Sequence, residues 1–534
     1  MEKRLISALA LSILIIVAFQ HFTAKPTPPP SAPVESAQTA PQEPKEAYLA
    51  VPKESIPTVE ETESVVETDR YILTFSNIGG AIKDVQLNDK EIRLKNLGQS
   101  LEIVRIKNQP DYLLNISGTG IGTNLSLAGY TMARSADSII YSFKTADWEI
   151  TKRYILHNTK YGIELQLFVK NLSGSPKDFN YRIIGGAGVT EPTDQDKRFI
   201  EATCSIDGKT IGFKRPKAGR IVNPGIVKWT ALKNKYFSLI LKPMAATKSQ
   251  FYSENGNGQL VTGVDIDTIA IQPGASVENR FILYMGPSDT PSLKKFGYNF
   301  EETVNYGFFG GISKVLIMVL GIFYKLIRSW GIAIILLSIF LNIILFPLTL
   351  KSFQSMQKMQ ALHPQMEKLK KLHKDNPQKL NKEIMELYKK YKINPFSGCL
   401  PMLLQMPIFI ALYQALMKSF ELWRTKFLWI QDLSAPDAVR IPITLPIVGN
   451  SINILPLIMV AAMVVQQKMS SKTMGGAVTE EQQQQQKMML IIMPIMFGFI
   501  FYNMPSGLVL YWVVNTTLTI VEQMAIMKNT AVEA

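Results

Sequence analysis

The sequence predicts a polytopic α-helical membrane protein that carries a large all-β domain outside the membrane. Residues 65–300 have the composition of soluble protein and contain short alternating segments, whereas uncharged apolar runs dominate residues 305–527. The chain has 534 residues and a formal charge of +14. Because many of its lysines lie in one loop between apolar runs, the charge indicates membrane topology rather than sequence-specific nucleic-acid binding.

Residues 1–24 are predicted to be a retained transmembrane anchor with a cytoplasmic N-terminus. Two basic residues precede an apolar run that ends at Phe19. A cleaved signal peptide is the alternative, but Phe22-Thr23-Ala24 places a bulky side chain where a signal peptidase requires a small one. Residues 25–64 contain nine prolines and predict an extended linker.

Residues 65–300 are predicted to form a β-sandwich. The stretch "RYILTFSNIGGAIKDVQL" alternates and breaks at Gly79-Gly80, and Trp148–Asn171 gives two strand-like runs around a polar turn at 157–160. "KYFSLILKP" and "ENRFILYMG" are further apolar strands. The aromatic residues of this region are most simply explained as core.

Residues 301–330 are predicted to contain an amphipathic helix that lies in the membrane interface. At ~100° per residue, Lys314, Lys325 and Arg328 fall within about 60° of one another. The uncharged stretch between Lys314 and Lys325 is too short to cross a bilayer, which needs ~20 residues. An ordinary core helix is the alternative.

Residues 331–527 are predicted to hold five further membrane spans, which with the anchor makes six. The uncharged runs are Gly331–Leu350, Pro395–Met417, Ile447–Val465, Met488–Met504 and Gly507–Val521. Between the first two, residues 351–392 carry eleven lysines against four acids, so the positive-inside rule makes this loop cytoplasmic and residues 65–300 periplasmic. The glutamine run Gln482–Gln486 is expected to be a flexible connector, and residues 528–534 a short tail.

Residues 351–394 are predicted to form a cytoplasmic helical hairpin with a methionine-rich face and a basic face. The residues assigned to it are Met356, Met359, Met366, Lys370 and Lys371. The hairpin is either a solvated surface element or a docking site for an acidic partner or a nascent hydrophobic chain, which adaptable methionines can accommodate.

No catalytic, cofactor or metal site is expected, and the chain is not expected to be an enzyme. Cys204 and Cys399 fall in regions predicted on opposite sides of the membrane, which argues against a disulfide or a thiolate metal site. The four histidines are scattered along the chain.

Polar side chains inside the predicted spans are more informative. Ser338 and Asn342 are four residues apart on one helix face. Gln405 and Gln414 interrupt the predicted span Pro395–Met417, and Asn515–Thr517 interrupts the last span. Lipid cannot hydrogen-bond an amide, so these groups should face protein or water. They either form interhelical hydrogen bonds or line a shared polar cavity.

Three segments, Phe346–Gln365, Asn394–Leu416 and Met504–Asn515, resemble the signature segments of the YidC family of membrane-protein insertases. The resemblance extends over nearly the whole chain, in the Gram-negative form. It implies a supersandwich-like periplasmic domain and a five-helix core around a hydrophilic groove, open to the cytoplasm and to lipid. It also implies insertion and folding of newly made integral membrane proteins in the bacterial inner membrane, alone or with the Sec translocon and the ribosome.

The resemblance suggests a set of groove residues as a hypothesis. They are Ser338, Asn342, Gln405, Phe409, Tyr511, Trp512 and Asn515. The family usually has an arginine at the position of Asn342, so this groove would lack a fixed positive charge. The tail "KNTAVEA" is also shorter and less basic than in many members.

Two other function classes remain open. A small-solute transporter would show inverted repeats, and none is evident. An anchored periplasmic carbohydrate-active protein would need convergent carboxylates or histidines in residues 65–300, where His157 is the one histidine. Deletion of residues 65–300 would inactivate such an enzyme but should largely spare an insertase.

Overall fold

The structure, a computed structural model, describes residues 59–532 with short internal gaps. The gaps are 108–109, 120–123, 136, 158–160, 191–193, 215–218, 246–247, 257–258, 374–375, 392, 394–399, 446–448 and 474–479. All the described residues belong to one compact unit. The predicted anchor, most of the predicted linker and Cys399 therefore lie outside the described residues.

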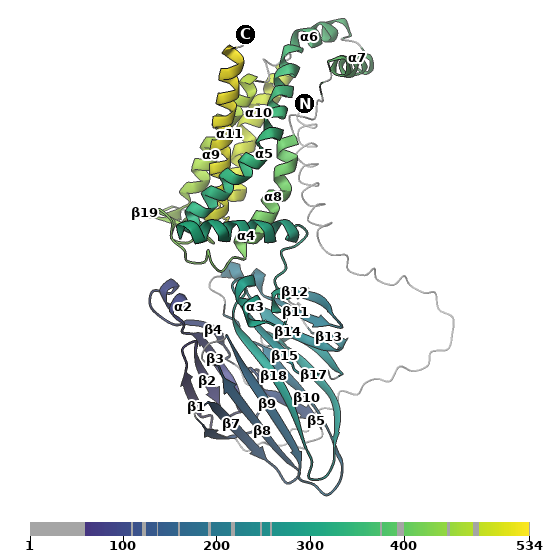
Figure 1. The fold of residues 1–534 in the computed structure, drawn as a ribbon, viewed down its shortest axis with the longest axis vertical. Helices are drawn as coiled ribbons and strands as arrows, with labels where there is room; N and C mark the ends of the chain where they lie inside the picture. Colours follow the sequence, from purple (N-terminus) through teal and green to yellow (C-terminus); the bar gives the residue numbers. More distant parts are fainter. Residues whose placement is uncertain are drawn as a thin grey trace, which may run out of the picture. The chain divides into compact units, whose positions relative to one another are not determined.

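The β domain contains three antiparallel sheets (Figure 1). The largest has, in spatial order, β12 (Lys209–Lys214), β11 (Glu201–Ile206), β14 (Val227–Lys233), β15 (Phe237–Pro243), β18 (Ser276–Pro287), β9 (Gly162–Asn171), β8 (Trp148–Leu156), β7 (Ser138–Lys144) and β6 (Thr131–Arg134). The second has β13 (Arg220–Gly225), β16 (Ser249–Gly256), β17 (Gln259–Ile271), β10 (Lys177–Gly186) and β5 (Ile116–Thr119). The third has β1 (Glu63–Glu67), β2 (Tyr71–Ser76), β3 (Ala81–Leu87) and β4 (Leu101–Arg105). Short helices complete the domain: α2 (Lys90–Lys95), η1 (Asp194–Phe199), α3 (Thr290–Phe296) and η2 (Phe300–Thr303).

The core of this domain lies between the large sheet and the two smaller ones. Along β9, apolar side chains alternate with more exposed polar ones, so one face of the strand is buried. Trp148 of β8 packs on Phe179 of β10, with ring centroids 5.6 Å apart. Phe75 of β2 stacks on Tyr141 of β7 at 6.1 Å. The predicted β-sandwich is therefore confirmed, including the hairpin formed by β8 and β9.

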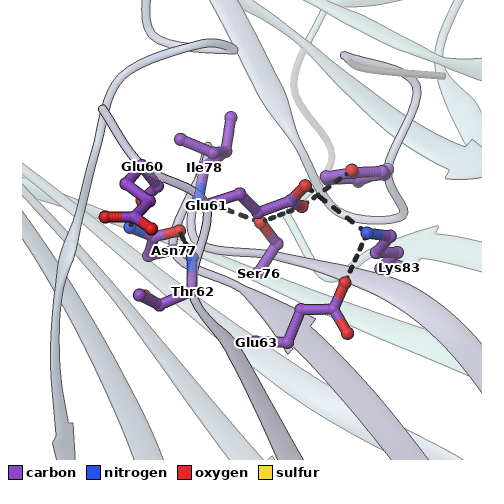
Figure 2. A network of polar contacts seen from close by, with 9 residues as sticks. Glu60, Glu61, Thr62, Glu63, Ser76, Asn77, Ile78 and Lys83 are labelled. Atoms are coloured by element: carbon purple, nitrogen blue, oxygen red, sulfur yellow. Dashed lines mark hydrogen bonds and ion pairs between the residues drawn. The ribbon is translucent and has the colours of Figure 1, made fainter. Parts of the chain in front are cut away.

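Polar contacts fix the start of β1, where the described chain enters the third sheet (Figure 2). The Glu61 carboxylate accepts hydrogen bonds from Ser76 Oγ at 2.7 Å and from Tyr112 Oη at 2.8 Å. Lys83 forms ion pairs with Glu61 and Glu63. Burial opposes ionisation of Glu61, but these hydrogen bonds and the lysine charge outweigh it and lower its pKa. The ordered domain thus begins a few residues before 65.

The C-terminal part is helical. Its helices are α4 (Gly310–Ile327), α5 (Trp330–Ala361), α6 (His363–Leu372), α7 (Pro377–Lys390), α8 (Leu400–Met417), α9 (Ile454–Thr473), α10 (Glu480–Phe501) and α11 (Ser506–Val532). A small hairpin of β19 (Val439–Leu445) and β20 (Gly449–Ile452) precedes α9. In the part of the chain that is described, α4, α5 and α11 are long and apolar enough to cross a membrane, while α8, α9 and α10 contain shorter apolar stretches.

Four predicted boundaries are wrong. The helix expected from Ile447 begins at Ile454, because Gly449–Ile452 pairs with the β-branched-rich segment Val439–Leu445 as the β19–β20 hairpin. The helix expected to end at Leu350 continues to Ala361, because nothing in residues 351–361 interrupts its hydrogen bonding.

Two further boundaries lie near the C-terminus. The glutamine run belongs to α10 instead of a flexible connector, consistent with the good helix propensity of glutamine. The last helix passes the expected limit at 527 and reaches Val532.

Helix α4 runs crosswise to α5 and α11 in Figure 1. One side is buried against α8, where Ser313 Oγ donates to the Ala411 carbonyl at 2.9 Å. Another side exposes apolar residues, namely Ile312, Val315, Met318, Ile322 and Leu326. This distribution is typical of an amphipathic helix; its location in the membrane interface stays a prediction.

The segment between α8 and β19 packs against the β domain. Trp423 is 3% exposed and lies 5.7 Å, ring to ring, from both Tyr236 and Phe237. On the same surface, Tyr236 Oη and Ser434 Oγ share a hydrogen bond of 2.9 Å, and Lys95 Nζ donates to the carbonyl of Phe420. These contacts join the β domain to the helical part through side chains from both.

Candidate functional site

Helix α5 carries the first two candidate residues at helical spacing. Ser338 is fully buried, and its hydroxyl donates to the carbonyl of Ile334. Asn342 lies one turn further on, where its amide nitrogen donates to the Ser338 carbonyl at 2.9 Å and to Asn515 Oδ1 at 2.8 Å. Both amide hydrogens of Asn342 are therefore used, one within α5 and one between helices.

Helix α11 carries three more candidates within five residues. Asn515 accepts the hydrogen bond from α5, and Tyr511, one turn earlier, accepts one from Gln405 Nε2 of α8. The spacing of four places Tyr511 and Asn515 on neighbouring parts of one helix face. Helix α11 thus joins two polar contacts that sequence spacing alone could not pair.

Aromatic side chains lie beside these polar contacts. Phe409 of α8 meets Trp512 of α11 edge to face, with centroids 5.1 Å apart. Phe501 of α10 lies 5.1 Å from Trp512 and 5.5 Å from Phe409, and Phe497 is 5.7 Å from Trp512. Sequence reasoning missed the two α10 residues; their spacing of four in "MFGFIF" was the available signal.

Burial differs sharply within the set. Tyr511 and Ser338 are buried, whereas Asn342, Gln405 and Asn515 keep partial exposure. An amide pair between helices is worth only ~0.6 kcal/mol on average in membranes. The pair therefore contributes little to stability, and both amides keep part of their surface exposed between apolar helices.

Gln414, the other glutamine of this helix, lies elsewhere. It packs against Gly307, which has φ +70°, and a Cβ at that glycine would lie 2.4 Å from Gln414 Oε1. Gln414 is therefore part of the contact between α8 and the segment before α4. It is not one of the contacts centred on α11.

The helical hairpin of the structure differs from the one predicted for residues 351–394. Its arms are α6 and α7 alone, because residues 351–361 belong to α5. Met356, which is 8% exposed, and Met359 consequently lie on α5. The predicted hairpin of residues 351–394 is too long at its start, and its end lies outside the described residues.

Within the hairpin, Met366 of α6 packs against α7, where Tyr388 Oη lies 3.5 Å from its sulfur. His373 Nε2, just after α6, lies 3.0 Å from the Glu383 carboxylate of α7. Lys370 is half-buried and Lys371 is exposed. The hairpin is therefore a packed unit with lysines on its surface.

Among the described residues, no group of three or more histidine, cysteine, aspartate or glutamate side chains is arranged to hold a metal ion. Cys204 is a free, buried thiol in β11, and burial raises its pKa to about 12. Such a thiol is protonated at neutral pH and unreactive.

Comparisons with known proteins cover both parts of the chain. Residues 63–319 match the family described as the YidC periplasmic domain, and residues 322–533 match the 60Kd inner membrane protein family. A curated protein of Pelobacter propionicus named "Membrane protein insertase YidC" is 34% identical, covering 99% of each chain. A protein of the same name from Geotalea daltonii is 32% identical over the same shares. A solved structure of an active YidC insertase is 18% identical, with a TM-score of 0.36, over 87% of this chain and 92% of the other.

Proposed function

The chain belongs to the YidC family of membrane protein insertases, and we propose that it inserts its substrates along a path formed by α5, α8 and α11. The substrates of this family are membrane proteins. A substrate segment must move polar groups across hydrocarbon, where one charged residue costs ~2.5–3.5 kcal/mol at the bilayer centre on insertion scales. Partly exposed amides at mid-span would lower that cost.

The observation that carries the proposal is the contact between Asn342 and Asn515. It places two amides from different helices together with partial exposure. Water around this pair would form the hydrophilic groove. No step of the proposed path needs a catalytic group or a cofactor, so the chain would act without enzymatic turnover.

Site-specific crosslinking tests the path. A photocrosslinker at Asn342 should react with ribosome-bound nascent membrane proteins. The matched control is the neighbouring Ile343, which is 66% exposed on another side of α5 and should react mainly with lipid. Equal substrate crosslinking from both positions, or none from 342, would overturn the proposed path.

Substitution gives a second test of the same site. Asn342→Arg should be tolerated in a hydrated groove, because water solvates the guanidinium, and the protein should stay abundant and active. Asn342→Leu should impair insertion of substrates with polar outer segments while leaving abundance unchanged. Loss of the Asn342→Arg protein from the membrane would show that the position is dry.

We infer six spans with a cytoplasmic N-terminus, and residues 65–300 in the periplasm. The lysine-rich loop and the periplasmic-domain match support this topology. Cys204 is buried and unsuitable for labelling, so the test uses a cysteine-free variant with single cysteines introduced at the exposed Lys170 and Lys371. An impermeant thiol reagent should label position 170 from outside and position 371 only after lysis; labelling of both from one side would refute the topology.

We also propose that the α6–α7 hairpin receives nascent chains near the ribosome, and that the chain works alone or beside the Sec translocon. The exposed lysines of the hairpin support contact with an acidic surface; they are Lys368, Lys371, Lys379, Lys382, Lys389 and Lys390. Replacing the three on α6 and the start of α7, Lys368, Lys371 and Lys379, with glutamine should weaken co-sedimentation with translating ribosomes. Unchanged co-sedimentation would remove this role.

A further inference from the structure

A cavity of about 460 Å³ lies between the β domain and the end of α8. Its walls come from η1 and β11, from β14 and β15, from the segment that leads into α4, and from Lys418 just after α8. Four parts of the chain that are distant in sequence therefore meet around it. It is separate from the contacts between α5, α8 and α11 described above.

The lining of this cavity is strongly basic. Lys197, Arg198, Lys233, Lys235 and Lys418 line it, against one acidic residue, Glu201. Asp196 and Asp432 also act on Lys235 electrostatically, but they are not part of the lining. The cavity therefore carries an excess of positive charge in a space from which water is partly excluded.

The three inner lysines are held mainly by backbone carbonyls. Lys233 Nζ donates to the Thr303 carbonyl at 2.5 Å and lies 3.5 Å from the Glu201 carboxylate. Lys235 Nζ donates to the Ser434 carbonyl at 3.1 Å. A carbonyl is neutral and takes one hydrogen bond from an ammonium group that has three donors.

Lys418 completes the inner group. Its ammonium donates to the Asn305 carbonyl, just before α4. Burial lowers the pKa of Lys418, with a further contribution from the like charge of Lys233, and burial also lowers the pKa of Lys235. Several partly desolvated cations side by side are unfavourable unless an anion offsets them.

The position of the cavity indicates which anion is within reach. Lys418 directly follows the last residue of α8, and Asn305 is three residues from Phe308, whose side chain is 88% exposed. The exposed apolar side of α4 follows from there. A basic cavity next to an exposed apolar strip matches a molecule with an anionic head and apolar tails.

We propose that this cavity binds the phosphate headgroup of an anionic phospholipid from the outer leaflet, with Arg198, Lys235 and Lys418 donating to the phosphate and the acyl chains lying along the exposed apolar side of α4. The inference goes beyond the proposed function and takes from it only the orientation in the membrane. A bound lipid would connect the β domain, α4 and α8, and would hold the β domain at a fixed place on the membrane surface.

The test uses the purified full chain in a neutral detergent. Phosphatidylglycerol, phosphatidylcholine and inorganic phosphate are titrated separately, with native mass spectrometry to count bound lipid and thermal unfolding to report stabilisation. Phosphatidylglycerol should bind and raise the unfolding temperature. The double variant Arg198→Gln/Lys418→Gln should bind it about tenfold more weakly or worse, because two charge-assisted hydrogen bonds are lost.

The matched control is Arg153→Gln/Lys170→Gln, which removes the same charge from exposed positions on β8 and β9. It should bind like the original chain. An equal loss in the control, equal binding of phosphatidylcholine, or inorganic phosphate binding as tightly as the lipid would each overturn the proposal. An acidic peptide that displaces the lipid at lower concentration would also overturn it, in favour of a polypeptide ligand.

A variant that fails to fold is replaced by single changes. Arg198→Gln alters only the exposed rim and should weaken binding, while Lys418→Arg keeps the charge and should preserve it. Binding unaffected by Arg198→Gln, or abolished by Lys418→Arg in a folded protein, would count against the site. Neither readout depends on insertion, so failure here is distinguishable from failure of the proposed function.

Discussion

Along β8, buried and more exposed side chains alternate, and Lys152 occupies one of the inward-facing positions. Its side chain is fully buried. Its ammonium donates to the carbonyls of Gly79 at 2.7 Å and Leu114 at 2.9 Å. The Gly79-Gly80 turn has φ angles of +68° and +52°, which glycine adopts without strain. A Cβ at Gly79 would lie 2.2 Å from Asn115 Oδ1. One buried lysine side chain therefore anchors a turn that the alternating pattern located but could not explain.

The burial of Lys152 predicts a specific dependence of stability on pH. Burial lowers its pKa well below the ordinary lysine value of about 10.4, so the unfolded chain binds more protons than the folded chain between the folded-state pKa and that value. The free energy of unfolding should consequently rise with pH up to about 10, by at most ~1.4 kcal/mol per pH unit from this group. In Lys152→Met this contribution disappears.

The measurement is the difference in unfolding midpoint between the original chain and Lys152→Met, from about pH 7 to pH 10 in detergent. Buried tyrosines titrate in both proteins, so their effect cancels in the difference. The original chain should gain on the variant as the pH rises. Parallel curves would show that Lys152 does not release its proton on folding.

The amide pair between α5 and α11 predicts a measurable but small coupling. In a double-mutant cycle, Asn342→Leu and Asn515→Leu should interact by ~0.6 kcal/mol, and by no more than ~1.7 kcal/mol. The cycle is measured by reversible unfolding in mixed micelles. A coupling near zero would mean that water replaces the contact, and one of several kcal/mol would mean that the pair is structural and dry.

Helices and strands differ in how far the sequence predicts them. Helix α8 was expected to end at Met417 and does so, because charge and loss of hydropathy mark its end. The start of α9 was predicted too early, because the stretch "IPITLPIVGNSI" is as apolar as a membrane span. In the structure this stretch contributes to the β19–β20 hairpin. The end of α5 was misplaced because lysines mark where a chain leaves lipid and do not mark where a helix stops.

Burial separates the three methionines into two predicted classes. Met356 is buried, so Met356→Ser should lower the free energy of unfolding, and with it the amount of folded protein. Truncating a buried methionine to alanine typically costs about 2–5 kcal/mol. Met359 and Met366 are half-buried. Met359→Ser/Met366→Ser should leave abundance unchanged and reduce insertion of hydrophobic substrates.

Steady-state level and insertion activity are measured for both proteins in the same cells. Normal insertion by the Met359→Ser/Met366→Ser protein would leave the methionines with a packing role alone. A fall in abundance for that protein equal to the fall for Met356→Ser would show that all three belong to one core.

For the whole molecule, the contact between the β domain and the helices depends on Trp423. Replacing it with alanine should cost about 3–5 kcal/mol, because a buried indole between Tyr236 and Phe237 leaves a cavity. The β domain and the helical part should then unfold in two separate transitions in calorimetry. The control Phe308→Ala removes an exposed aromatic ring and should leave a single transition.

The arrangement of sheets could not be obtained from the sequence. Alternation assigns the buried face of β9 and β18, but it does not reveal that these strands, over a hundred residues apart, are hydrogen-bonded neighbours. The same limit applies at the candidate site. Spacing placed Ser338 beside Asn342 on one helix, whereas the partner Asn515 depends on how α5 and α11 pack.

In the topology proposed above, the continuous course of α5 sets the height of the α6–α7 hairpin above the cytoplasmic membrane surface. Its 32 residues make a rod of about 48 Å, and the hydrocarbon layer accounts for roughly 30 Å of that length. The remaining ~18 Å of helix would place α6 and α7 beyond the lipid headgroups. Under the proposed function, a polypeptide that reaches the hairpin would be held at a set distance from the bilayer. Shortening the part of α5 after residue 350 by whole helical turns should change that distance while leaving the hairpin intact.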